Sequence, residues 1–252
     1  MPATTGPAEH RQPRTAPHEE DEMTRSTAHA WRQFGDGPLS RFASRVYILV
    51  VVEVLLLVTT LPGLLPLLLL GRDPSNLPLA ALLLLPVGPA VCAALYALRH
   101  QPPDLTDLRP AALFWRGYRL NAGGALRVWA PTVLWLTVLA LNLAYRGAIG
   151  LPRWWVVPLV LIAVGVTVCA ANALVITSLF EFRTRDVLRL AVHFLVRTPG
   201  VTVGNALLLA AAAGVTAVFS EAVLALLASV VALAVLRVGD PMIHLIRKEF
   251  TA

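Results

Sequence analysis

Six long apolar runs constrain the fold of this chain more than any other feature. A helix that crosses the hydrocarbon of a bilayer needs about 20 apolar residues. The runs cover residues 46–70, 78–98, 127–145, 154–180, 201–219 and 221–238. They lack the two-residue alternation of membrane barrel strands, so helices are the form that satisfies their backbone groups in lipid. The sequence therefore predicts an all-α fold, a polytopic membrane helix bundle of about six transmembrane helices.

Composition agrees with this prediction. Hydrophobic residues make up 57% of the 252 residues and charged residues only 14%, against about 25% charged residues in an ordinary soluble domain. The last two runs form one unbroken apolar stretch, about twice the length that one span needs. Ser220 and Glu221 are the polar pair near its middle, so we expect the chain to turn there.

Positive charges lie mostly on one side of this arrangement. Cytoplasmic loops of membrane proteins carry the excess of arginine and lysine. With the N-terminus inside, fifteen basic residues near the runs fall in inner segments and three in outer loops. The inner set is Arg32, Arg41, Arg45, Arg99, Arg109, Arg116, Arg119, Arg127, Arg183, Arg185, Arg189, Arg197, Arg237, Arg247 and Lys248, and the outer set is Arg72, Arg146 and Arg153. The asymmetry predicts a multi-pass protein with both termini in the cytoplasm.

The ends of the chain differ from its centre. Residues 1–40 are rich in Pro, Thr, His and acidic residues, which predicts a disordered cytoplasmic tail. Met23 is an alternative start of the protein. The first apolar run is too long for a signal peptide and no small-residue cleavage site follows it, so we expect it to remain as an anchor. The transmembrane domain is expected over 41–245, followed by a short cytoplasmic C-terminus at 246–252.

Two cytoplasmic segments have the pattern of amphipathic helices. In the first, Arg116, Arg119 and Arg127 fall within one helical arc of about 80° and nearby aromatic residues fall in another, as in a helix at headgroup level. Gly123 and Gly124 predict a bend into the next span.

The second segment, TRDVLRLAVHFLVRTPG, begins at Thr184. Thr184 is expected to cap the helix and Pro199 with Gly200 to end it. Its basic face carries Arg185, Arg189, His193 and Arg197. Both helices could simply hold their loops against lipid, or they could form a docking surface for a membrane or cytosolic partner.

Polar residues inside the runs are the other candidate site. Glu53 is the deepest ionisable residue, and a carboxyl in hydrocarbon is a candidate for a proton or cation path. The alternative is a neutral or hydrogen-bonded group inside the bundle. Its expected partners are Thr59, Thr60, Asn142 or Asn172. We favour this alternative, because a transporter usually carries several intramembrane charges or broken helices around a shared polar site.

Signatures of catalysis are missing from the sequence. It contains no H-E-x-x-H, G-x-S-x-G or C-x-x-C motif and no phosphate-binding glycine loop. Cys92 and Cys169 lie in apolar runs, and His100, His193 and His244 lack metal-ligand spacing. We therefore predict no enzyme activity, no metal and no cofactor. The arginines lie between apolar runs rather than in one patch, which argues against a nucleic-acid partner despite a pI near 10.1.

Four segments resemble the DUF624 or YesL-type bacterial membrane proteins over residues 37–245. They are RVYILVVVEVLLLVTTLPG, LPVGPAVCAALYAL, FWRGYRLN and SLFEFRTRDVLRLAVHFLVRTPGVTVGN. Family members often carry Asn where this chain has Glu53, and their link between the first two spans is shorter. The resemblance implies a six-helix protein of the bacterial plasma (inner) membrane, encoded near carbohydrate ABC importers, and it carries over no catalytic residue.

The leading functional hypothesis is a non-enzymatic integral membrane accessory protein of carbohydrate (ABC-type) uptake. Its partners would be the lipid bilayer and a transporter subunit or cytosolic protein, contacted through the amphipathic loops. The alternative is a small transporter or permease that uses Glu53, and a third hypothesis is a membrane lipid-modifying enzyme. Arginine-dominated usage of basic residues is typical of a high-GC actinobacterium. The sequence predicts no particular oligomeric state.

Overall fold

The computed structural model describes residues 38–71, 73–101, 108–148, 150 and 152–250. The chain forms two units, Met1–Ser44 and Arg45–Ala252, and the account below concerns the second. The expected tail lies outside the described residues up to position 37, whereas residues 38–40 already belong to the first helix.

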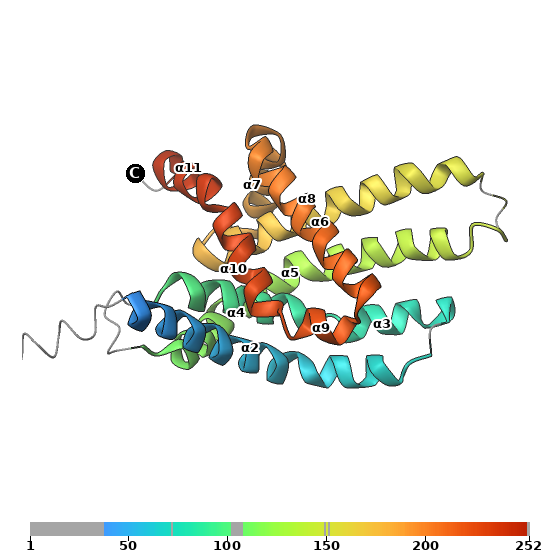
Figure 1. Cartoon of the computed structure of the whole chain (residues 1–252). Coiled ribbons are helices and arrows are strands. Elements are labelled where there is room, and N and C mark those ends of the chain that lie inside the picture. Colours follow the sequence, from blue (N-terminus) through green and yellow to red (C-terminus); the bar gives the residue numbers. More distant parts are fainter. Residues whose placement is uncertain (1–37, 72, 102–107, 149, 151, 251–252) are drawn as a thin grey trace, which may run out of the picture. The chain divides into compact units, whose positions relative to one another are not determined.

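Helices make up the fold, and the described residues contain no strand. In chain order they are α2 (Pro38–Leu69), η1 (Pro74–Asn76), α3 (Leu77–Leu83), α4 (Val87–Arg99), α5 (Pro110–Ala144), η2 (Arg153–Trp155), α6 (Val156–Leu179), α7 (Thr184–Arg197), α8 (Pro199–Val218), α9 (Glu221–Ala225), α10 (Ala228–Val238) and α11 (Asp240–Phe250) (Figure 1). The predicted all-α fold class is confirmed.

Four of these helices, α2, α5, α6 and α8, are long and apolar enough to cross a membrane. Two further pairs qualify when each is counted as one bent span: the segment through α3 and α4, bent by 42°, and α10 with α11, bent by 50°. The described chain therefore has four such helices, or up to six with the bent pairs. This is the architecture of a polytopic membrane helix bundle.

The predicted second span is broken at residues 84–86. Pro86 stands at the N-cap of α4, and the carbonyl oxygen of Leu84 accepts a hydrogen bond from Trp129 Nε1 of α5 at 2.9 Å. Broken helices are tolerated in lipid when neighbouring side chains satisfy the freed backbone groups in this way. A side chain at position 88 would come within 2.4 Å of Trp129, so glycine is required there.

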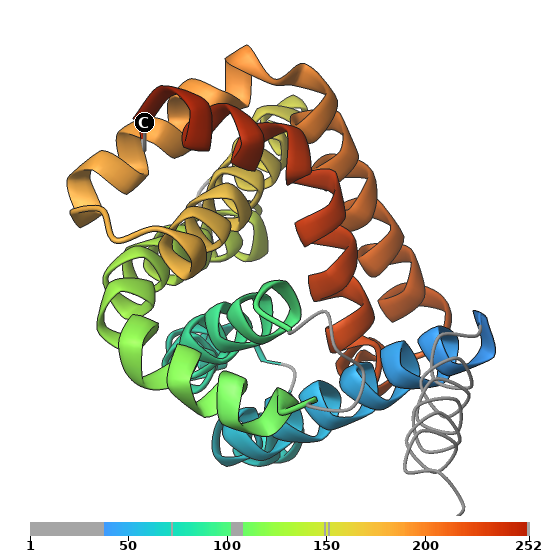
Figure 2. The ribbon, with the colours of Figure 1, turned by 90° about the vertical axis from the view of Figure 1, so that its left-hand side faces the viewer.

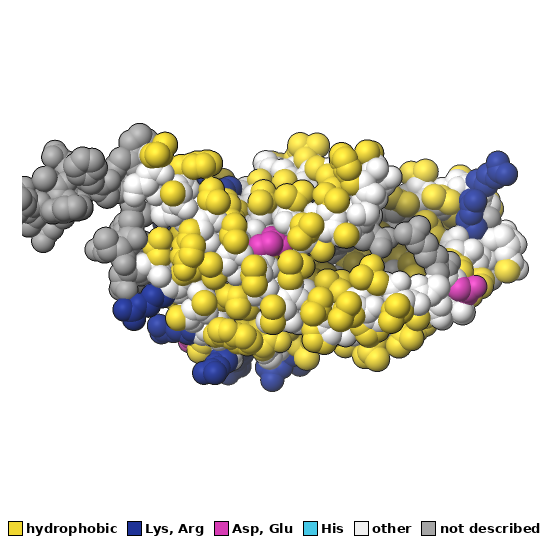
Figure 3. Space-filling view, turned by 60° about the horizontal axis from the view of Figure 1, so that its bottom comes forward, with side chains coloured by type: hydrophobic (Ala, Val, Ile, Leu, Met, Phe, Trp, Pro, Cys, Tyr) yellow, Lys and Arg dark blue, Asp and Glu magenta, His cyan; other side chains and the backbone are white. Residues whose placement is uncertain are grey.

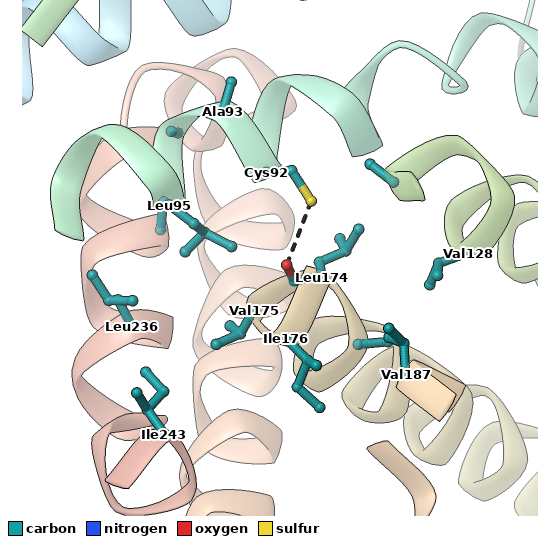
Figure 4. Packing of buried hydrophobic residues seen from close by; sticks show 14 of the residues in the cluster. Cys92, Ala93, Leu95, Val128, Leu174, Val175, Ile176, Val187, Leu236 and Ile243 are labelled. Atoms are coloured by element: carbon teal, nitrogen blue, oxygen red, sulfur yellow. Dashed lines mark hydrogen bonds between the residues drawn. The ribbon is translucent and has the colours of Figure 1, made fainter. Parts of the chain in front are cut away.

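Helix α4 lies at the centre of the second unit. It packs against α5, α6 and α10, and Figure 2 shows it enclosed by these helices and α2. Most of α4 is buried, including Cys92, whose Sγ lies 3.4 Å from the carbonyl oxygen of Leu174 in α6 (Figure 4). Cys92 thus packs as a small apolar residue with one weak hydrogen bond, as expected from its apolar run.

The outer surfaces of the spans are apolar. Large exposed side chains include Val50, Leu65, Leu134, Leu161 and Leu207, and Figure 3 shows one face covered mainly by hydrophobic side chains. Threonines within the spans donate to the carbonyl four residues earlier, as Thr132 and Thr137 do in α5. An apolar surface with internally satisfied hydroxyl groups fits lipid as the surrounding solvent.

Two expectations about the helices need correction. Gly123 and Gly124 do not bend the chain, because α5 continues unbroken from Pro110 to Ala144. The first amphipathic segment is therefore the basic end of a span rather than a separate loop helix. The turn at Ser220 is confirmed, since its Oγ caps α9 through the N–H of Val223, but the expected span 221–238 is broken between α9 and α10. Helix α11 runs from Asp240 to Phe250, across residue 245.

Candidate functional site

The predicted basic segments meet at one end of the bundle, which we call the basic end. It comprises the last turn of α4, the basic half of α5 (residues 110–127), the non-helical segment 180–183, α7 and α11. At about 1.5 Å per residue α5 is about 52 Å long, whereas the hydrocarbon core is about 30 Å thick. A helix of this length reaches well beyond the hydrocarbon. Its basic half carries the arginines, so we expect this half to lie outside the hydrocarbon.

The three predicted arginines of α5 are all solvent-exposed. Arg116, Arg119 and Arg127 have no hydrogen bond or ion pair within the described part of the chain. The expected aromatic face is only partly at the surface. Trp115 is exposed, but Phe114 is fully buried in the core, since the basic half of α5 packs against α4 and α7.

Helix α7 is fixed to the bundle by its apolar face. Val187, Ala191 and Phe194 are 2%, 0% and 0% exposed. Thr184 is not the cap that its residue type predicts, because it is already the first helical residue. Arg183 occupies the N-cap and makes no side-chain cap hydrogen bond. The helix ends at Arg197, directly before Thr198 and Pro199, as predicted.

The polar face of α7 divides into two parts. Arg185 and Arg189 are exposed and have no partner among the described residues. Arg197 instead donates to Oε1 of Glu249 in α11 at 2.6 Å and lies 3.4 Å from His193 Nε2. The second part is thus engaged inside the protein, and only the first is free for another molecule.

Helix α7 also exposes a row of apolar side chains, the apolar ridge. Leu188, Val192 and Val196 are 40%, 56% and 81% exposed. Spaced four residues apart, they form one row along the helix, next to the row of Arg185 and Arg189. We call these five residues the α7 face.

Glu53 has a hydrogen-bond partner that the sequence did not indicate. Its Oε2 accepts from the backbone N–H of Ser229 at 2.6 Å, while its Oε1 is shielded from solvent and has no partner. Ser229 is the second residue of α10, where the backbone N–H groups have no acceptor within the helix. A carboxylate is stabilised there by the helix dipole. Glu53 of α2 therefore caps the N-terminus of α10.

The partners expected for Glu53 were wrong. Thr59 and Thr60 donate to carbonyl groups of their own helix, and Asn142 donates to the carbonyl of Val138. Asn172 is fully buried, and its Oδ1 accepts from Nδ2 of Asn205 in α8 at 3.0 Å. Such an amide pair between helices favours one alignment of α6 and α8.

Sequence reasoning missed several residues at the basic end. Arg99 of α4 pairs with Asp240 of α11 at 3.0 Å, and Asn121, His100 and Arg183 line a pocket beside Arg116. A periodic pattern assigns a residue to a face of its own helix. It contains no information on which residue of another helix lies opposite.

The described residues of the basic end offer guanidinium, amide and apolar side chains. The described residues include no group of three His, Cys, Asp or Glu side chains that could hold a metal ion. Fold and surface together define a polytopic α-helical membrane protein with a basic, partly apolar surface at one end. No family model, curated protein or solved structure matches the chain.

Proposed function

We propose that this protein is a non-enzymatic membrane accessory protein that binds a partner through the α7 face at its basic end. The observation that carries the proposal is that one face of α7 is buried against the bundle while the α7 face is exposed. Phe194 and Ala191 anchor the helix, while Arg185 and Arg189 have no partner among the described residues. An anchored helix presents its side chains with little loss of entropy on binding.

The partner of this surface would combine apolar side chains with carboxylates. Leu188, Val192 and Val196 supply apolar contact area, and two guanidinium groups supply forked donors that match a carboxylate. The resemblance to YesL-type proteins points to a subunit of a carbohydrate ABC importer. The charge asymmetry of the sequence supports a cytoplasmic position for the basic end and both termini of a protein in a bacterial plasma membrane.

Replacement of Arg185 and Arg189 by lysine tests this proposal. Lysine keeps the charge and loses the fork, so a carboxylate-binding surface should fail while lipid attraction should persist. We expect recovery of a co-expressed importer subunit after crosslinking in native membranes to fall about tenfold or more, from about 1.5–3 kcal/mol per charged hydrogen bond.

The matched control is Arg146→Lys with Arg153→Lys, two exposed arginines outside the basic end. This variant should recover the subunit like the parent. The triple change of Arg116, Arg119 and Arg127 to lysine should have the smaller effect, since the basic half of α5 lacks the apolar ridge. Unchanged recovery with both basic segments converted would leave the arginines as lipid anchors and would refute docking through guanidinium groups.

A second candidate, a small transporter, is favoured by the position of Glu53 at a broken helix, since discontinuous helices form the ion sites of many transporters. Its test is Glu53→Gln in reconstituted vesicles. A proton or cation path through Glu53 requires loss of transport in this variant, whereas a structural cap requires the variant to behave like the parent. We expect the second result, because an amide oxygen can still accept from Ser229.

A further inference from the structure

A polar pocket of about 560 Å³ lies at the basic end. Its walls come from the end of α4, from the basic half of α5, and from the end of α6 with the segment that joins α6 to α7, which runs beside α5 in Figure 2. It differs from the α7 face, because neither Arg185 nor Arg189 lines it. The pocket therefore needs an explanation beyond the proposed docking function.

Two guanidinium groups line this pocket without an acidic partner. Arg116 comes from α5 and Arg183 from the N-cap of α7, and neither has a hydrogen bond or ion pair to a described residue. One carboxylate, that of Glu181, also lines the pocket and forms no ion pair with either arginine. The formal charge of the lining is therefore positive, which favours an anion.

An amide in the same pocket has an unused donor. Asn121 Nδ2 is shielded from solvent and has no hydrogen-bond partner among the described residues. A buried donor without an acceptor costs about 1–3 kcal/mol. A ligand oxygen in the pocket would remove this cost.

His100 provides a further polar group in the lining. Its Nδ1 lies 3.0 Å from the carbonyl oxygen of Tyr96, and its ring stacks on the Tyr96 ring at 4.1 Å. A carbonyl oxygen can only accept, so Nδ1 carries the proton of the neutral ring and Nε2 has no partner in the described chain. A protonated ring would donate from both nitrogens.

The remaining wall is aromatic. Phe180 and Phe182 stack with ring centroids 5.7 Å apart, on a segment whose extended backbone places alternate side chains on one side. Both line the pocket, together with Tyr96. The pocket thus combines donors for an anion with an apolar wall for an organic group.

We infer that this pocket binds a phosphate ester, with Arg116, Arg183 and Asn121 donating to its phosphate oxygens and the Phe180–Phe182 pair contacting its organic part. A phosphate presents several oxygens in three dimensions and suits donors from separate elements, whereas the two oxygens of a carboxylate lie in one plane. A membrane phospholipid headgroup and a free phosphate ester share this chemistry.

The test measures binding of two probes with the same headgroup to the purified full-length protein. Phosphatidic acid in nanodiscs of otherwise neutral lipid represents the lipid source, and glycerol 3-phosphate in solution represents the free source. We expect at least one probe to bind the parent, and Arg116→Gln with Arg183→Gln to weaken that binding about a hundredfold through loss of two charged hydrogen bonds. Asn121→Asp should also weaken it, because a carboxylate would face the anion.

The matched control is Arg119→Gln with Arg127→Gln, which removes the same charge from exposed residues of α5 outside the pocket. It should bind the probe within a few-fold of the parent. Binding of phosphatidic acid alone identifies a lipid site, and binding of glycerol 3-phosphate identifies a site for a soluble ester. The inference is overturned if the parent binds neither probe, or if the two double variants weaken binding equally, since that result reports only the surface potential. Thermal unfolding of each variant without probe separates loss of binding from loss of fold.

Discussion

The apolar interior and the basic end differ in whether their polar side chains have partners within the protein. Between the spans, three polar side chains are bonded across helices: Glu53 to the N–H of Ser229, Asn172 to Asn205, and Trp129 to the carbonyl of Leu84. At the basic end, the exposed Arg116, Arg119 and Arg127 of α5 and Arg185 and Arg189 of α7 have no partner in the described chain. The difference indicates that interior polar groups stabilise broken or tightly packed helices, while the groups at the end are available to bind other molecules.

Two ion pairs lie within the basic end. Arg99 with Asp240 and Arg197 with Glu249 both link α11 to an element of the basic end. Their side chains are partly exposed, so each pair is expected to contribute less than about 1 kcal/mol. The anchoring of the basic end depends more on buried apolar side chains.

Phe194→Ala should have the largest effect of the changes considered. Phe194 lies on the buried face of α7 and is fully buried. Truncation of such a side chain costs about 3–5 kcal/mol. Hydrogen exchange of α7 should rise strongly in this variant, and unfolding in mixed micelles should occur at a lower denaturant concentration. Val196→Ala, at an 81% exposed position of the same helix, should stay within about 0.5 kcal/mol of the parent. Equal effects of the two changes would mean that α7 lies on lipid and not on the bundle.

Glu53→Leu should have the next largest effect. It removes the acceptor of the Ser229 N–H at the start of α10, and an orphaned buried donor costs about 1–3 kcal/mol. Glu53→Gln keeps an acceptor and should cost less than about 1 kcal/mol. The free energy of unfolding of both variants gives the comparison. A glutamine variant as unstable as the leucine variant would show that the charge of Glu53, and not its hydrogen bond, matters in the interior.

Glycine replacements in α5 should have a smaller effect of opposite sign. No atom lies within 4 Å of a Cβ built on Gly123, whereas one on Gly124 would meet Thr177 at 3.1 Å. Because α5 is a continuous helix, Gly123→Ala should stabilise the protein by about 0.5–1 kcal/mol. Gly124→Ala should gain less, since Thr177 must move. Thermal unfolding in detergent distinguishes the two variants. Destabilisation by Gly123→Ala would indicate that α5 bends at this glycine, contrary to the continuous helix.

Hydrophobic run length and periodicity were sufficient to predict the all-α membrane fold, the turn at Ser220 and the amphipathic character of α7. The break at Pro86 was missed, because the apolar run continues through it without a change in composition. The continuity of α5 was missed because its composition changes at Gly123 and Gly124 although the helix does not break there. A glycine pair weakens an isolated helix, but Gly124 fits closely against Thr177 of α6, a contact that composition does not indicate.

The candidate sites were predicted only within single helices. The arc of Arg116, Arg119 and Arg127 follows from helical geometry, and all three are exposed. The partners of Glu53 and Asn172 lie 176 and 33 residues away along the chain, and the pocket combines residues from three separate segments. Pairing at such separations depends on how the helices pack, which one sequence does not encode in a local pattern.

Labelling of single cysteines with a membrane-impermeant maleimide tests the central claim most directly. That claim is that the basic end, with the α7 face and the pocket, faces the cytoplasm. Arg153→Cys reports the opposite end and Arg189→Cys the α7 face, and the parent controls for Cys92 and Cys169, which lie within α4 and α6. The account predicts that Arg153→Cys is labelled in intact spheroplasts and that Arg189→Cys is labelled only after the membrane is opened. Labelling of Arg189→Cys in intact spheroplasts would contradict it.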